Sequence, residues 1–262
     1  MTTTQRLQEI ESWFTSYVSR FQSPDPAYTR NIELKKDHTF RVCREIIRLG
    51  KSLNLSPQDL NLATATALLH DVGRFEQYAR YQTFDDFKSE NHARLSIKVI
   101  DREKVLHKID PPTKKLITCT ILYHNQAHLP SGETDRCLFF SKLLRDADKL
   151  DILFVVTQYY QNKDQNPNQS LELELPDTPQ ISDEVYDDVV SRNIVNAKHI
   201  QTLNDFKLLQ MAWIYDLNFP LTYQMVKKRK YLEKIRDVLP SSPRAQKAYA
   251  AARSYLNKKI IP

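Results

Sequence analysis

The stretch that decides the fold is residues 67–74, Ala-Leu-Leu-His-Asp-Val-Gly-Arg, which places the pair His70-Asp71 at the end of an apolar segment. The preceding run Ser56-Pro57-Gln58-Asp59 supplies an N-cap, a proline in the first turn and an early acidic residue, as helix starts commonly do. Gly73 follows the pair and is expected to break the helix. One helix is therefore predicted here, and it ends in an imidazole and a carboxylate.

Two further polar side chains lie where apolar ones are expected. His38 lies on the apolar stripe of the preceding predicted helix, which we expect to end at Gly50. Asp148 lies within residues 143–156, a run that is apolar almost all round. An ionised carboxylate in such a helix is costly unless it is paired with a cation or bound to a metal.

The helix that contains Asp148 leaves two alternatives open. Asp146 is the main rival of Asp148, because both lie on apolar stripes. Arg145 and Lys149 could pair with the aspartates of this helix, and the cluster would then be structural. Helical periodicity alone does not separate these interpretations.

Glycine is scarce, and its scarcity excludes two classes of nucleotide-binding protein. The chain has 262 residues and 3 glycines, whereas a phosphate-binding P-loop or a dinucleotide fingerprint needs clustered glycines. Many-stranded β folds also use glycine in hairpin turns. Apolar residues recur at helical spacing, so the predicted fold class is all-α. We expect a helix over about residues 91–108, a looser stretch over 75–88, and strand-like alternation at 171–175.

The cysteines and the hydropathy indicate a cytoplasmic protein. Cys43, Cys119 and Cys137 are isolated and form no C-x-x-C pair, so we expect neither a disulfide framework nor a cysteine zinc site. No apolar stretch approaches the roughly 18 residues of a membrane span. A membrane partner is therefore not expected.

The net charge of +6 is unevenly distributed along the chain. Residues 221–262 contain 11 Lys and Arg against 2 Asp and Glu, whereas residues 164–190 contain 8 acidic and no basic residues. A basic segment can bind nucleic acid or another polyanion. We favour a solvated helix face, because an apolar stripe runs beside the basic residues, formed by Tyr223, Val226, Tyr231, Ile235 and Leu239. Nucleic acid is thus the less favoured partner.

Together, His38, the pair His70-Asp71 and Asp148 resemble the signature of the HD-domain metal-dependent phosphohydrolase superfamily. The run His70-Asp-Val-Gly-Arg74 is similar to the family's H-D-x-G-[K/R], and Asp148-Lys-Leu-Asp151 is similar to its final D-[R/K]-L-[D/H]. The resemblance covers about residues 31–157 and favours Asp148 over Asp146. It implies an all-α, HD-domain-like helical bundle that binds a metal.

The resemblance also implies how the chain is organised. We expect a single HD-type helical domain over residues 1–262. Its metal-binding core would span about residues 31–157, and a C-terminal helical extension would span about residues 182–262. The extension is given no role beyond packing.

Two more histidines extend the resemblance to a subset of the family that holds two metals. His92 and His124 fall between the His-Asp pair and the last aspartate, which completes the order H…HD…H…H…D. By that resemblance Asp71 would bridge two ions. His38, His70 and Asp148 would complete one site, and His92 and His124 would complete the second.

The implied activity is hydrolysis of a phosphate ester of a nucleotide or a related small metabolite by metal-activated water. Imidazole and carboxylate ligands suit one or two ions of Fe, Mn, Zn, Ni or Co better than Mg. Arg74 is expected to bind phosphate through its planar fork, with an ion pair to Glu76 as the structural alternative. Lys149 would neutralise substrate charge. Asp71 is the third predicted catalytic residue, with Arg74 and Lys149. Glu76 and Asp151 are weaker candidates for relaying a proton.

Two other functions stay open at this point. The same six-ligand pattern resembles the di-iron oxygenases of the superfamily, such as the inositol oxygenase group. A non-catalytic nucleotide- or metal-binding module is the other alternative. The expected partner is a small, phosphorylated, nucleotide-like substrate, and no oligomeric state is predicted.

Overall fold

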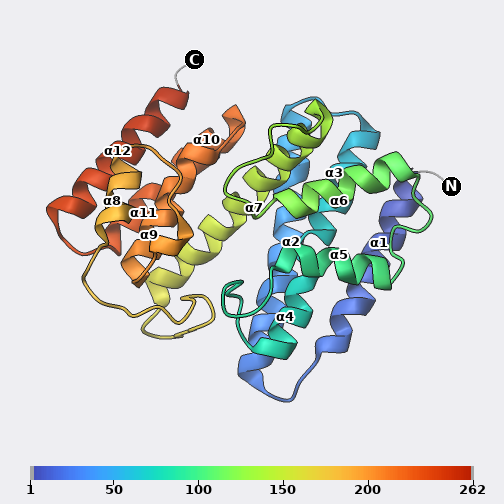
Figure 1. Cartoon of the computed structure of the whole chain (residues 1–262), viewed down its shortest axis with the longest axis horizontal. Coiled ribbons are helices and arrows are strands. Elements are labelled where there is room, and N and C mark those ends of the chain that lie inside the picture. The colour runs from blue at the N-terminus through green and yellow to red at the C-terminus, as the bar shows by residue number, and fades with distance from the viewer. Residues whose placement is uncertain (1–2, 261–262) are drawn as a thin grey trace. The chain divides into compact units, whose positions relative to one another are not determined.

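The structure is a computed structural model that describes residues 3–260, and Figure 1 shows these as helices joined by turns and loops. No strand occurs among the described residues, which confirms the all-α prediction. The chain forms two compact units, Met1–Asp148 and Lys149–Pro262, and the boundary falls within the long helix α7 (Asp135–Asn162). That residues 1–262 form a single domain stays a prediction. None of the described helices is both long and apolar enough to cross a membrane.

The first unit contains six complete α-helices and the first half of α7. The six are α1 (Thr3–Val18), α2 (Pro26–Ser52), α3 (Pro57–Leu69), α4 (Gly73–Tyr81), α5 (His92–Arg102) and α6 (Pro111–Tyr123), with a short 3-10 turn, η1 (Ser19–Phe21), after α1. The predicted start of α3 is confirmed, because Oγ of Ser56 accepts a hydrogen bond from the Asp59 amide. The carboxylate of Asp110 caps α6 in the same way, through the Thr113 amide.

The core of the first unit lies where α2 and α1 pack against α3 and where α4 packs against α5. Large apolar side chains with almost no exposure fill it, among them Phe14, Leu69 and Phe75. The rings of Phe14 and Phe75 meet edge to face with their centroids 5.9 Å apart. Burial of this kind supplies most of the folding free energy of a helical unit. It also gives the ends of α3, α5 and α6 a fixed scaffold.

Two glycines serve close packing. Gly50 was expected to end α2, but the helix continues to Ser52. A Cβ on Gly50 would lie 2.8 Å from Cδ1 of Leu60. A Cβ on Gly73 would lie 2.5 Å from the backbone N of Ser96 and 2.6 Å from the carbonyl O of His92. Gly73 therefore allows α5 to approach the turn that holds His70 and Asp71.

Three local predictions were wrong. The first half of the looser stretch 75–88 belongs to helix α4, whose short amphipathic pattern was missed. Helix α5 ends at Arg102 rather than near residue 108, and turns follow it. Residues 171–175 form turns instead of a strand, with positive φ angles at Leu173 and Glu174. Five alternating residues are too few to specify a strand when no partner strand is near.

The second unit contains the rest of α7, five further α-helices and two 3-10 turns. They are α8 (Asp183–Val190), η2 (Ala197–His199), α9 (Leu203–Ala212), η3 (Trp213–Asp216), α10 (Pro220–Lys228), α11 (Tyr231–Asp237) and α12 (Pro243–Ile260). Helix α12 packs against α8, α10 and α11. All five residues of the predicted apolar stripe are buried, namely Tyr223, Val226, Tyr231, Ile235 and Leu239. The basic segment therefore has the apolar face that was expected of it.

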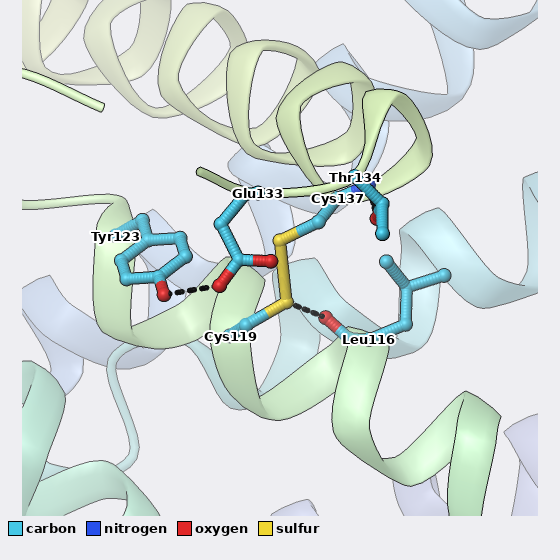
Figure 2. The surroundings of a disulfide bond; sticks show 6 residues. All are labelled: Leu116, Cys119, Tyr123, Glu133, Thr134 and Cys137. Carbon is cyan, nitrogen blue, oxygen red and sulfur yellow. Dashed lines mark hydrogen bonds between the residues drawn. A yellow bond between two sulfur atoms is a disulfide. The ribbon is translucent and has the colours of Figure 1, made fainter. Parts of the chain in front are cut away.

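A disulfide joins Cys119 of α6 to Cys137 in the first turn of α7 (Figure 2). The expectation that the three cysteines are unpaired was wrong for these two. The pair is 18 residues apart in sequence, and the loop between the helices folds back and brings the two sulfurs together. Beside them, the Tyr123 hydroxyl donates to the Glu133 carboxylate over 2.6 Å. Cys43 is free and buried in α2.

Candidate metal centre

Five helices of the first unit bring six side chains to one place. The sequence analysis singled out all six as candidate ligands, and they are His38 in α2, His70 and Asp71 after α3, His92 at the start of α5, His124 at the end of α6, and Asp148 in α7. All are buried except Asp148, which is partly buried. Overlapping groups of three among them have donor atoms within 4.8 Å of one another and could hold a metal ion.

One group of donors gathers on one side of the Asp71 carboxylate. Oδ2 of Asp71 lies 3.6 Å from Nε2 of His38 and 3.9 Å from Nε2 of His70. Oδ1 of Asp148 faces the same two nitrogens at 3.2 and 3.7 Å. Two imidazole nitrogens and two carboxylate oxygens therefore converge.

A second group gathers on the other oxygen of Asp71. Oδ1 lies 3.5 Å from Nε2 of His92 and 3.7 Å from Nε2 of His124. The two imidazole nitrogens are 3.0 Å apart. The two oxygens of one carboxylate thus face two different pairs of histidines, which is the arrangement of a bridging ligand.

The imidazoles are oriented as metal ligands usually are. Nδ1 of His70 lies 2.6 Å from the carbonyl O of Ala67, and Nδ1 of His124 lies 2.6 Å from the carbonyl O of Ile121. Each Nδ1 therefore carries the proton and leaves the lone pair on Nε2. Nε2 of His70 is buried and accepts no hydrogen bond. A buried acceptor of this kind is costly alone and fits a metal ion.

Charges and hydrogen bonds keep the two carboxylates ionised. Burial by itself raises the pKa of Asp71, but the ammonium of Lys35 and the neighbouring imidazoles outweigh it and hold the pKa well below its usual range. Burial likewise raises the pKa of Asp148, but the neighbouring imidazoles of His38 and His70 together outweigh it and hold the pKa well below its usual range. Both residues are therefore carboxylates at neutral pH, the form that binds a cation.

Asp86 orients His92 and was missed in the sequence. Its Oδ2 lies 2.7 Å from Nδ1 of His92, and it is held by Nη1 of Arg74 at 3.1 Å and by Nε2 of Gln77 at 2.9 Å. Burial and the charge of Arg74 lower the pKa of His92 to about 4, so the ring is neutral and its Nε2 is unprotonated. Asp86 follows α4 in a loop of no clear pattern, and no local signal marks it.

Lys35 is a second residue that sequence reasoning missed. Its Nζ lies 3.2 Å from Oδ2 of Asp71 and 5.0 Å from the centre of the Phe84 ring. Lys35 precedes His38 by three residues, so the two share a face of α2. That spacing was the available signal.

Arg74 lies at the candidate metal centre, as expected, but other residues than Glu76 hold it in place. Its Nη1 donates to the carbonyl O of Phe84 over 2.6 Å and pairs with Asp86 rather than Glu76. Its Nε lies 3.7 Å from Oδ1 of Asp71, and its Nη2 lies 3.4 Å from Nε2 of His92. One edge of the guanidinium is thus fixed and the other faces the candidate ligands.

Glu76 lies in a separate ion-pair network. Its carboxylate binds Arg80 at 2.6 Å, also binds Arg102, and accepts a hydrogen bond from the Tyr17 hydroxyl at 3.2 Å. Burial raises its pKa, but Arg102 and Arg80 outweigh this and lower it. These contacts favour a structural role for Glu76 over a proton relay.

Arg145 and Lys149, which flank Asp148 in α7, contact different partners. Nη1 of Arg145 donates to the carbonyl oxygens of Tyr123 and His124, both at 3.2 Å, and so holds the end of α6. Nζ of Lys149 forms an ion pair with Asp216 at 2.7 Å in the second unit. Among the residues that the structure describes, the His/Asp groups that could hold a metal include Asp148 and not Asp146. The choice that the resemblance favoured therefore agrees with the geometry.

Comparisons with known proteins indicate the family to which the chain is similar. Residues 36–153 match the family model of the HD domain. Over 120 residues the chain is 30% identical to the Bacillus subtilis (strain 168) protein named "Putative phosphohydrolase YueE". The aligned part is 44% of this chain and 64% of that protein, so the chain spans less than two thirds of the relative's length. No solved structure matches the chain.

Proposed function

The chain carries an HD domain over residues 36–153, and from this premise we propose that the protein is a metal-dependent phosphohydrolase. The proposed substrate is a phosphate ester of a nucleotide or a related small metabolite. One observation carries the proposal: the two oxygens of Asp71 face two separate pairs of histidines, His38 with His70 and His92 with His124.

The six residues fit two divalent ions that share Asp71. His38, His70 and Asp148 would hold one ion, and His92 and His124 would hold the other. Imidazole and carboxylate donors favour Fe, Mn, Zn, Ni or Co over Mg. When bound, such ions lower the pKa of water and neutralise phosphoryl oxygens. The protein's own contribution is to orient the donors, through the carbonyls at Nδ1 of His70 and His124 and through Asp86 at His92.

Two cations of the first unit can bind the substrate phosphate. Arg74 is anchored by one nitrogen and presents its remaining edge toward Asp71 and His92. Lys35 presents an ammonium on the opposite oxygen of Asp71. A phosphate held between them would be neutralised from two sides, and Arg74 would also fix its orientation. Lys149 is retained as a third candidate for substrate charge. A cytoplasmic location stays a prediction that no longer rests on the cysteines, because Cys119 and Cys137 form a disulfide.

The first test is metal analysis of the purified protein together with phosphate release from a panel of nucleoside monophosphates without oxygen. About two metal equivalents with anaerobic phosphate release support the proposal. Two irons without phosphate release would replace it by the di-iron oxygenase alternative. Metal binding without any turnover would favour a binding module, and no metal after reconstitution would contradict a metal site altogether.

A matched pair of variants tests the second ion. His92→Ala is expected to remove one of two metal equivalents and to abolish most phosphate release. His107→Ala is the control, because His107 is exposed and does not belong to the His/Asp groups. Unchanged metal content in His92→Ala would contradict the two-ion arrangement while leaving a one-ion phosphohydrolase open to the same assay.

A further inference from the structure

The first unit contains a cavity that is lined by none of the six candidate metal ligands. Its volume is about 420 Å³, and α1, α3 and α6 contribute to its walls. The apolar part of the wall is formed by Leu7, Ile10, Leu62 and Ile117. This volume lies within the range of small-molecule sites, and the lining combines apolar side chains with a larger number of polar and charged ones.

Three basic side chains line the same cavity, and two of them form no salt bridge. Arg136 pairs with Asp59 at 2.5 Å. Nη1 of Arg6 is buried and makes no hydrogen bond. Neither Arg6 nor Lys108 forms an ion pair with any residue that the structure describes. A guanidinium nitrogen that is removed from water and left unbonded is unfavourable, and an anion in the cavity would satisfy it.

The dipoles of two helices also favour a negative charge in this cavity. The cavity lies at the N-terminal ends of α3 and α6, since Gln58, Asp59 and Thr113 line it. Helix N-termini favour negative charge. Asp59, in the first turn of α3, and Asp110, the N-cap of α6, also line the cavity, so three basic and two acidic side chains leave one positive charge. This net positive charge is small, and it comes from the two cations without a salt bridge, Arg6 and Lys108.

We propose that this cavity is a binding site for a small phosphorylated molecule with an apolar body. The unpaired nitrogens of Arg6 and Lys108 would bind the phosphate group, and the apolar wall formed by Leu7, Ile10, Leu62 and Ile117 would cover the body. A guanidinium and an ammonium together suit a dianion with three oxygens better than a carboxylate. The site is distinct from the metal centre and does not depend on the proposed function.

The probe is phenylphosphonate, which carries an apolar ring and a dianionic group and has no ester bond to hydrolyse. Its binding is measured by isothermal titration calorimetry on the full chain and on His92→Ala, in which the metal centre is impaired. Binding in the cavity is expected to persist in His92→Ala. Loss of all binding in that variant would place the probe at the metal centre and overturn the proposal, as would no binding to either protein.

Charge variants locate the probe. Arg6→Gln and Lys108→Gln, each also made with His92→Ala, are expected to weaken phenylphosphonate at least fivefold. Lys108 is exposed, so Lys108→Gln keeps the test valid if Arg6→Gln fails to fold. Arg30→Gln, at an exposed position of α2, is the control and should bind as the parent does. Equal affinities in all three variants would exclude the cavity.

Two further probes test the ligand class. Benzyl alcohol has the ring without the charge and is expected not to bind. Benzoate has the ring with one negative charge and should bind at least fivefold more weakly than phenylphosphonate. Equal affinity for benzoate would overturn the assignment of a phosphate group in favour of a carboxylate.

Discussion

Oδ2 of Asp86 lies 2.7 Å from Nδ1 of His92, and this contact directs Nε2 of His92 toward Asp71. Burial and Arg74 keep the ring neutral by lowering its pKa to about 4, so Nδ1–H donates a hydrogen bond to the Asp86 carboxylate. A ring held in this tautomer is ready to bind a cation through Nε2 without reorganisation. The contact therefore links a loop of no sequence pattern to the candidate second ion.

Asp86→Asn is expected to weaken metal binding because the amide no longer fixes the tautomer of His92. Loss of such a contact typically costs about 10–100-fold in metal affinity. Metal titration by calorimetry measures it, with Asp101→Asn, at an exposed position of α5, as the control. Equal metal affinity in the two variants would show that Asp86 does not orient a ligand.

Lys35→Gln is expected to lower kcat/KM for a phosphate substrate by about 10–100-fold, the range for a lost charged hydrogen bond. Its metal content should not fall, because removing the ammonium also removes a competitor for Asp71. Lys36→Gln is a matched control, since Lys36 is the next residue and pairs with Glu33. Steady-state kinetics that do not distinguish the two variants would exclude Lys35 from substrate binding.

Gly73→Ala is expected to destabilise the protein by about 1–3 kcal/mol and to disturb metal binding. The new Cβ would meet backbone atoms of Ser96 and His92, which can move only if α5 shifts. Gly132→Ala is the control, because nothing lies within 4 Å of its added Cβ. Chemical denaturation and metal analysis are the measurements, and a fully stable Gly73→Ala protein with normal metal content would contradict the close approach.

Reduction of the disulfide is expected to lower the free energy of unfolding by about 3 kcal/mol, the entropic value for a closed loop of this length. Thiol titration of the unfolded, unreduced protein should find one free thiol, Cys43, and three after reduction. Cys119→Ala should make the melting temperature insensitive to reductant. Three free thiols before reduction would contradict the disulfide.

Glu76 is expected to contribute to stability in a pH-dependent way. Its folded-state pKa lies below the value of about 4.5 for an unfolded chain, so its contribution is present above that value and is lost as pH falls through the folded-state pKa. Glu76→Gln should cost about 1–3 kcal/mol at pH 7 and progressively less below pH 4.

The control for Glu76→Gln is Glu33→Gln, which removes an exposed carboxylate of α2. Denaturation curves at several pH values give the difference between the two variants. A gap that stays constant with pH would contradict the shifted pKa. Metal content and turnover should stay normal in Glu76→Gln, and a large loss of turnover would instead favour the proton relay.

The fold class could be predicted because it depends on local spacing, whereas the set of candidate ligands followed from the resemblance to the HD-domain superfamily. Helix periodicity and the caps at Ser56 and Asp110 act within a few residues. The same is true of the pair His70-Asp71. Helix α4 was missed because it is short, and five alternating residues at 171–175 suggested a strand that turns replace. Roles in catalysis stay predictions for Asp71, Arg74 and Lys149.

By itself, the sequence determined that the chain is helical, because apolar residues and helix caps recur at helical spacing, and its resemblance to the HD-domain superfamily identified the candidate histidines and aspartates. The tertiary structure alone decided that Asp71 faces two pairs of histidines, that Asp86 and Lys35 join them, and that Cys119 meets Cys137. These partners lie on different helices and loops. Their proximity depends on how α2–α7 pack, and packing is set by the whole apolar core rather than by any short pattern.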